Sequence, residues 1–254
     1  MKFIYIEKTP PSARFSFARK AFHMLGLVFP LCLYFDVFGW LKDSMPHPTR
    51  TIVLGFNVVF LLVLIVSDIL RFRSPGFRDL YYGIFGNLMK KEEAEYFNAS
   101  IPYAVSSITL FLFFSNEVVV LACLLFMLGD PAAAFFGIKF GRIRFWNKKS
   151  LEGLLGFFVF GVVICILFLW AASNGPLGLP NPAGKNMAVI VMLLIGGAVA
   201  AVAELLSSTA FKGLVDDNLW VPLSGALGLA LAGIYVSGFA PDAVFFDPAL
   251  LFGK

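Results

Sequence analysis

Charged side chains are scarce in this sequence. Its 254 residues are 14% charged and 59% hydrophobic, whereas soluble domains carry about 25% charged residues. This shortage excludes an ordinary soluble domain. The apolar residues form unbroken runs rather than short alternating segments, which favours helices over a membrane β-barrel. The sequence therefore predicts an all-α, polytopic integral membrane protein in which residues 1–254 form one domain.

Several familiar patterns are also missing. The cysteines Cys32, Cys123 and Cys165 stand singly in apolar runs, so no disulfide or metal-binding cysteine spacing exists. No inverted repeat is visible, which removes support for a repeat-built transporter. No G-x-x-x-x-G-K-S/T loop is present, which excludes a P-loop kinase. The first 20 residues lack the apolar core of a cleavable signal peptide, so none is expected.

Apolar runs of the length needed to cross a membrane, roughly 20 residues, predict about seven transmembrane helices. Most of the 20 lysines and arginines fall in segments on the same side as the N-terminus. By the positive-inside rule, this predicts a cytoplasmic N-terminus and an external C-terminus. The predicted spans are about 21–41, 50–70, 99–115, 117–138, 151–173, 187–206 and 219–239.

Three segments on the predicted cytoplasmic side differ in character. Residues 1–18 form a basic arm. Residues 71–98 carry apolar side chains at helical spacing, which predicts an amphipathic helix lying on the cytoplasmic interface. Residues 139–150 form a basic loop between the fourth and fifth spans and are the candidate nucleotide loop.

Two polar clusters lie at the inner ends of the first two spans. Arg19 and His23 are four residues apart and share a helix face, where cations can bind phosphate. Asp68 and Arg71 are three residues apart, a spacing at which the two can simply pair on one helix face. Arg19 and His23 are therefore candidate nucleotide ligands.

A third cluster begins with Asp130, a carboxylate inside an apolar run that needs a partner or a cation there. Gly137 and Gly141 follow at a spacing that serves helix packing or lets a backbone approach a phosphate closely. Cations and a hydroxyl can hold phosphate oxygens, and a carboxylate suits the start of the next helix. The residues of those types that complete the cluster are Lys148, Lys149, Ser150 and Glu152.

The fourth cluster combines Glu204, in the inner half of the sixth span, with Asp216, Asp217 and Asn218 at the start of the seventh. Asp217 or Asn218 could serve only as a helix N-cap. Two acids and an amide beside a membrane-embedded glutamate are also the oxygen ligands that Mg²⁺ prefers. We expect Asp130, Asp217 and Asn218 to be metal ligands.

With the predicted topology, all four clusters face the cytoplasm. Cations, oxygen ligands and glycines would then gather at one end of the helices. Such a set suits phosphoryl transfer from a magnesium-bound nucleotide. We expect Asp130 to be essential for this reaction, with Asp217 as the first candidate for the base and Glu204 as the second.

Four motifs, in this order, resemble those of the CTP-dependent lipid kinases, the group of dolichol kinase, phytol kinase and yeast-type diacylglycerol kinase. The resemblance implies a polytopic enzyme with Asp130, Gly137, Gly141, Lys149, Ser150 and Glu152 at the nucleotide site, and with Asp217 and Asn218 in metal binding or catalysis. Pro131, and Asn98 where a glycine is expected, depart from the family pattern. The motifs are Arg19-Lys20-x-x-His23, Gly129-Asp130-x-x-Ala133-x-x-x-Gly137-x-x-x-Gly141, Lys149-Ser150-x-Glu152-Gly153 and Asp216-Asp217-Asn218-x-x-x-Pro222-Leu223.

The resemblance implies transfer of the γ-phosphate of CTP, or of another nucleoside triphosphate, to a polyprenol, a phytol-type alcohol or diacylglycerol. Mg²⁺ is the expected cofactor, and the site is expected to face the cytoplasm in a bacterial inner membrane or an ER-type membrane. Lys148, Lys149 and Arg19 would offset phosphate charge. No nucleic acid partner is expected, and homo-oligomerisation stays open. The alternatives are a cytidylyltransferase using the same nucleotide site and an ion-coupled transporter.

Overall fold

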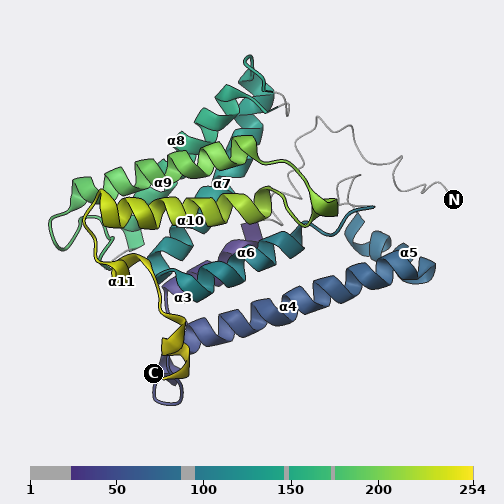
Figure 1. Cartoon of the computed structure of the whole chain (residues 1–254), viewed down its shortest axis with the longest axis horizontal. Helices are drawn as coiled ribbons and strands as arrows, with labels where there is room; N and C mark the ends of the chain where they lie inside the picture. The colour runs from purple at the N-terminus through teal and green to yellow at the C-terminus, as the bar shows by residue number, and fades with distance from the viewer. Residues whose placement is uncertain (1–23, 87–94, 146–148, 173–174, 254) are drawn as a thin grey trace.

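A computed structural model describes residues 24–86, 95–145, 149–172 and 175–253 (Figure 1). Within these ranges the chain forms helices, with isolated β-bridges and no sheet. The elements, in order, are η1 (Leu25–Leu27), α3 (Val28–Tyr34), η2 (Gly39–Leu41), α4 (Pro48–Arg73), α5 (Pro75–Phe85), α6 (Ser100–Phe113), α7 (Asn116–Phe140), α8 (Leu151–Ala172), α9 (Asn186–Leu206), η5 (Phe211–Gly213), α10 (Asp217–Tyr235), α11 (Pro241–Val244) and η6 (Pro248–Phe252).

Five of the described helices, α4, α7, α8, α9 and α10, are long and apolar enough to cross a membrane. Each coincides with a predicted span, which confirms an all-α, polytopic membrane protein. The other two predicted spans are shorter apolar helices, Leu25–Tyr34 and Ser100–Phe113. The seven crossings and their orientation therefore stay predictions.

Local contacts explain where the helix of the first predicted span ends. The helix stops before Asp36, whose backbone is left-handed with a φ of 49°. The Asp36 carboxylate accepts a hydrogen bond from the Thr49 hydroxyl at 2.7 Å and pairs with Lys42 at 2.7 Å. A polar turn held in this way cannot continue an apolar helix to residue 41.

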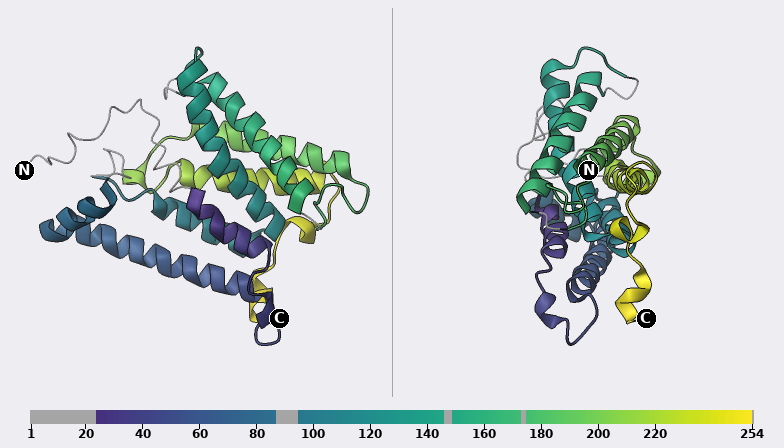
Figure 2. Two further views of the ribbon diagram at one scale, coloured as in Figure 1. Left: turned by 180° about the vertical axis from the view of Figure 1, so that it is seen from behind. Right: turned by 90° about the vertical axis from the view of Figure 1, so that its left-hand side faces the viewer.

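α7 is the centre of the bundle and α4 is its outermost long helix. In the most apolar window of each helix, 72% of α7 is buried by other parts of the protein but only 17% of α4. α7 packs on α8 and α10, whereas α4 meets the bundle through α6 and α3 (Figures 1 and 2). Lipid is the expected neighbour of most of α4.

Two buried arginines attach α4 to both ends of the short helix α6. At one end, the guanidinium of Arg50 binds the carbonyl oxygens of Phe111 and Phe114, which are left free where α6 stops. At the other end, Arg71 and Asp68 pair with each other, are both 0% exposed and bind the backbone just before α6. The pairing that the spacing of Asp68 and Arg71 allows is thus present in the structure.

The predicted interfacial segment forms a helix over part of its length. α5 begins after Ser74, whose hydroxyl caps the Phe77 N–H, and has proline at its first position. It buries Tyr81 and Tyr82 and leaves Leu80 and Ile84 exposed. Its location on the membrane interface stays a prediction, and residues 87–94 of the segment lie outside the described ranges.

Candidate active site

Three carboxylates from three different helices gather at one end of the bundle. α9 and α10 pack side by side and are joined by residues 207–216, so the end of α9, with Glu204, meets the start of α10, with Asp217 (Figure 1). Asp130, in the second half of α7, lies in the same region, near enough for its charge, like that of Asp217, to act on the Glu204 carboxylate. The structure therefore brings together the three acidic residues that the sequence singled out for catalysis.

Lys149 joins this acidic group through Glu204. Its ammonium lies 2.9 Å from Glu204 Oε1 and 2.9 Å from Ser207 Oγ, and it also donates to the Glu204 backbone carbonyl. An ammonium has three N–H donors, so these contacts use all of them. A phosphate oxygen can bind Lys149 only by replacing one of these partners. The sequence predicted a phosphate-binding lysine but not its pairing with Glu204.

The start of α10 is organised by Asp216. Its carboxylate accepts from the Asn218 backbone N–H at 3.0 Å and from the Asn218 side-chain amide at 2.7 Å. Asp216 is therefore the N-cap, a role the sequence analysis had considered for Asp217 or Asn218. Asp217 is left in the first turn with its carboxylate half-buried and outside this capping pair.

Pro222 explains a contact that sequence reasoning missed. Proline has no N–H, so the carbonyl four residues earlier, that of Asn218, lacks its helical partner. The Ser106 hydroxyl of α6, which also lies 2.8 Å from its own helix's Tyr103 carbonyl, reaches the Asn218 carbonyl at 3.0 Å. The signal in the sequence was a proline four residues after Asn218, but the donor could be identified only in three dimensions.

The glycines of the Asp130 cluster lie where α7 and α8 touch. A Cβ atom on Gly137 or Gly141 would lie 3.0 Å or 2.9 Å from Ser150 Oγ, and one on Gly153 would lie 3.0 Å from the Ala133 carbonyl oxygen. The Ser150 hydroxyl accepts from the Gly153 N–H and is buried at the start of α8. These contacts fit the helix-packing interpretation of the small-xxx-small spacing, and the expected place of these residues at the nucleotide site stays a prediction.

Glu152 closes the loop that connects α7 and α8. Its Oε1 accepts from the backbone N–H groups of Arg142 and Ile143, and Arg144 forms a β-bridge with Ser150. The helical hairpin ends in this loop and projects from the bundle (Figure 2). Its direct contacts are structural, and its expected nucleotide role stays a prediction.

Three predicted nucleotide ligands cannot be placed. Arg19, His23 and Lys148 lie outside the described residues. The basic arm of residues 1–18 lies outside them too. Of the predicted site, the structure therefore describes the acids, Lys149 and the α7–α8 hairpin.

Comparison with curated proteins finds three fungal enzymes, each named CTP-dependent diacylglycerol kinase 1. The chain is 30% identical to the enzyme of Eremothecium gossypii over 218 residues, which are 82% of this chain and 64% of the relative. It is 28% identical to the enzyme of Saccharomyces cerevisiae over 218 residues, 82% of this chain and 70% of the relative. It is 31% identical to the enzyme of Schizosaccharomyces pombe over 182 residues, 71% of this chain and 78% of the relative.

The chain belongs to the CTP-dependent lipid kinase family. The Eremothecium gossypii relative is longer, and the chain spans 64% of it. No family model matches the chain, and no solved structure matches it. The resemblance seen in the motifs is thus confirmed by similarity that covers most of the sequence.

The acidic group fits a magnesium ion only if the nucleotide shares it. Among the described residues, no three His, Cys, Asp or Glu side chains lie close enough to hold an ion by themselves. Mg²⁺ is commonly bound by one or two carboxylates together with substrate phosphates and water. The half-buried carboxylates of Asp130 and Asp217 suit that arrangement. The Asn218 side-chain nitrogen donates to Asp216, which leaves its amide oxygen as the atom that could face a metal, and its expected role as a ligand stays a prediction.

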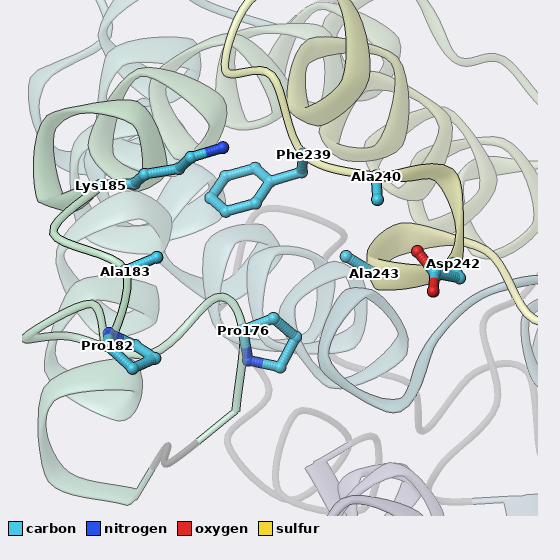
Figure 3. Close-up of a pocket in the computed structure, with 8 residues that line it drawn as sticks. All are labelled: Pro176, Pro182, Ala183, Lys185, Phe239, Ala240, Asp242 and Ala243. Carbon is cyan, nitrogen blue, oxygen red and sulfur yellow. The ribbon is translucent and has the colours of Figure 1, made fainter.

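A cavity of ≈ 570 Å³ lies at the opposite end of α9 and α10 from the acidic group (Figure 3). It is formed by the connection before α9 and the segment after α10, so it is separated from Glu204 and Asp217 by the length of those two helices. The Lys185 ammonium lies over the Phe239 ring and binds the Gly238 carbonyl. This cavity holds none of the predicted catalytic residues.

Proposed function

We propose that this protein is a membrane kinase that transfers the γ-phosphate of CTP to the hydroxyl of a lipid alcohol. Diacylglycerol is the first candidate for the acceptor, because the fungal relatives are named as kinases of that lipid. The observation that carries the proposal is the meeting of Asp130, Glu204 and Asp217 with Lys149 at one end of the bundle. Polyprenol and phytol-type alcohols are the other acceptors to test.

Asp130 and Asp217 would hold Mg²⁺ together with the nucleotide phosphates. When bound, the ion supplies charge neutralisation on the β- and γ-phosphates. Asp217 stands at the N-terminus of α10, where the helix dipole favours a charged carboxylate. Asp216 and Ser106 fix that first turn, so Asp217 is held in a defined position.

Lys149 would change partners when CTP enters. Exchanging the Ser207 hydroxyl for a phosphate oxygen replaces a neutral acceptor with a charged one, and charge-assisted hydrogen bonds are stronger. Glu204 would keep Lys149 oriented and is the alternative base. The incoming hydroxyl, positioned beside Asp217, would lose its proton to that carboxylate as the new O–P bond forms and the bond to CDP breaks.

The proposed topology places this site on the cytoplasmic side, where CTP is available. α9, which carries Glu204 near its end, stops and α10, which carries Asp217, begins at the end of the bundle at which α4 stops (Figure 1). The basic residues counted in the sequence favour the cytoplasm for that end. Lipid alcohol would then reach the site from within the bilayer.

The decisive experiment uses purified protein, Mg²⁺ and CTP labelled in either the α- or the γ-phosphate, with a panel of lipid alcohols and, as the acceptor that a cytidylyltransferase needs, phosphatidate. A kinase moves γ-label to the lipid and releases CDP. Transfer of α-label to the lipid, with γ-label in pyrophosphate, would identify a cytidylyltransferase instead. No label in any lipid would reject both enzymes.

A further inference from the structure

The buried Asp68–Arg71 pair on α4 is not explained by attachment of α4 to α6 alone. Both side chains are 0% exposed, and Arg71 Nε and Nη2 lie 3.0 Å and 2.8 Å from the same oxygen, Asp68 Oδ1. Removing two charges from water is costly, and buried ion pairs are often no more stabilising than well-packed apolar residues. Their directional hydrogen bonds, in contrast, fix the position of whatever they hold.

What the pair holds is the backbone before α6. Arg71 Nη2 donates to the Tyr96 carbonyl at 2.8 Å, and Asp68 Oδ2 accepts from the Asn98 N–H at 2.6 Å. These contacts lie on either side of Phe97. The Asn98 amide adds a hydrogen bond to the Tyr81 hydroxyl of α5 at 2.7 Å.

Phe97 connects the Asp68–Arg71 pair to the segment that precedes Asp217. Its N–H donates to the Lys212 carbonyl at 2.8 Å. Phe211, Lys212 and Gly213 all have positive φ, at 48°, 53° and 91°. Such a backbone is strained at non-glycine residues and persists only where neighbouring contacts hold it. A Cβ on Gly213 would lie 3.0 Å from the Phe97 carbonyl oxygen.

The held turn leads directly into α10. Ala210 and Val215 pair across it in a β-bridge, and Asp216 and Asp217 follow at once. The geometry points to Asp68 and Arg71 as positioning residues: through Phe97 they fix the 207–216 turn and so set the position of Asp217 at the start of α10. This inference rests on the proposed function in assigning Asp217 a role in the reaction.

α4 offers a matched control at its other end. Arg50 is also buried, at 3% exposed, and it also binds backbone carbonyls at an end of α6. It does not contact residues 95–98 or the 207–216 turn. Loss of either arginine weakens the attachment of α4 to α6, but only loss of Arg71 releases the turn.

The test compares Arg71→Gln with Arg50→Gln in lipid nanodiscs, with hydrogen exchange of the ligand-free protein as the first measurement. We expect Arg71→Gln to speed amide exchange at least tenfold in residues 210–217 and to leave α8 unchanged. Arg50→Gln should change exchange at the end of α6 but not in residues 210–217. Equal exchange of that turn in the two variants would overturn the inference.

The second measurement is the Mg²⁺ concentration that gives half-maximal transfer of label from CTP to lipid. A displaced Asp217 should raise this Mg²⁺ concentration several-fold in Arg71→Gln and not in Arg50→Gln, whereas simple loss of folded enzyme lowers the maximum rate and leaves the midpoint unchanged.

If Arg71→Gln does not fold, Gly213→Ala loosens the same connection from the other side and should give the same two changes. Normal exchange and an unchanged midpoint in Gly213→Ala would overturn the inference. A wild-type protein that transfers no label would reject the proposed function, and the exchange comparison would still decide the positioning role.

Discussion

At the scale of single residues, the proposed site depends on carboxylates in or next to apolar helices, where an ionisable side chain costs free energy unless it binds a partner. Asp130 is the clearest case, since it lies in the second half of α7, the most buried of the long helices. An ionised side chain in such a span is costly and commonly marks a functional site. Its charge acts on Glu204, as does that of Asp217, so this carboxylate belongs to the region of the proposed reaction.

Asp130→Asn should therefore lower phosphoryl transfer by about 10²–10³-fold, because an amide of the same shape cannot supply the negative charge that a metal-bound phosphate requires. The rate of γ-label transfer to lipid measures the loss, and gel filtration in detergent measures folding. A folded variant that keeps the wild-type rate would remove Asp130 from the mechanism.

Lys149→Met should raise the KM for CTP about tenfold, the effect of losing roughly 1.4 kcal/mol of phosphate binding. It should also lower thermal stability, because Glu204, at 6% exposed, would lose its cation. Lys42→Met is the matched control, since Lys42 is an exposed lysine that pairs with a carboxylate, that of Asp36, outside the proposed site. The double variant Lys149→Met with Glu204→Gln should recover stability without recovering the KM; recovery of both would show that Lys149 has only a structural role.

At the scale of elements, two separate hydrogen-bonding groups, the Asp216 carboxylate and the Ser106 hydroxyl, hold the first turn of α10. The Asp216 cap satisfies N–H groups, and the Ser106 hydroxyl satisfies the carbonyl that Pro222 leaves free. The same turn carries Asp217. Local stability and the position of the proposed catalytic acid therefore depend on the same contacts.

Ser106→Ala should destabilise the protein by about 1–3 kcal/mol, the cost of a buried acceptor left without a donor. Thr109→Val, on the same helix, removes a hydroxyl that bonds only to its own helix's Val105 carbonyl, and it should change stability little. Thermal unfolding in detergent compares the two variants. Equal melting temperatures would show that the Asn218 carbonyl does not need Ser106.

Much of this architecture could be predicted from the sequence, because hydropathy alone sets where a chain enters the membrane. The long helices and the gathering of Asp130, Glu204 and Asp217 follow from apolar runs and the places where acids interrupt them. The ends of α3 and α6 could not be predicted. The end of α6 depends on a contact distant in sequence, that of Arg50 with Phe114, and the end of α3 depends on the polar turn held by Asp36. The pairing of Lys149 with Glu204 is likewise a contact between separate helices.

At the scale of the whole molecule, the two ends of the bundle are chemically different. One end carries the acidic group and Lys149, and the other carries the cavity beside Lys185 and the Arg50 contacts. Antiparallel packing of α9 on α10 fixes this separation. The proposed orientation therefore decides which compartment supplies the nucleotide.

Single cysteines introduced at the exposed residues Lys212 and Asp242, in a chain whose three native cysteines are replaced by alanine, should react from opposite sides. A maleimide that cannot cross the membrane should label Lys212→Cys only in inverted vesicles and Asp242→Cys only in right-side-out vesicles. Labelling of both from one side would contradict the proposed crossing of α10 and its C-terminal extension.

The bond between Ser106 and Asn218 also sets the depth of the reaction. Ser106 is six residues from Ser100, the start of α6, which is about 9 Å along the helix axis. If α6 crosses as proposed, α10 starts well beneath the plane in which α6 emerges. Water and the triphosphate then have to enter below the membrane surface to reach the hydroxyl of a lipid alcohol. The lipid substrate can react without leaving the bilayer.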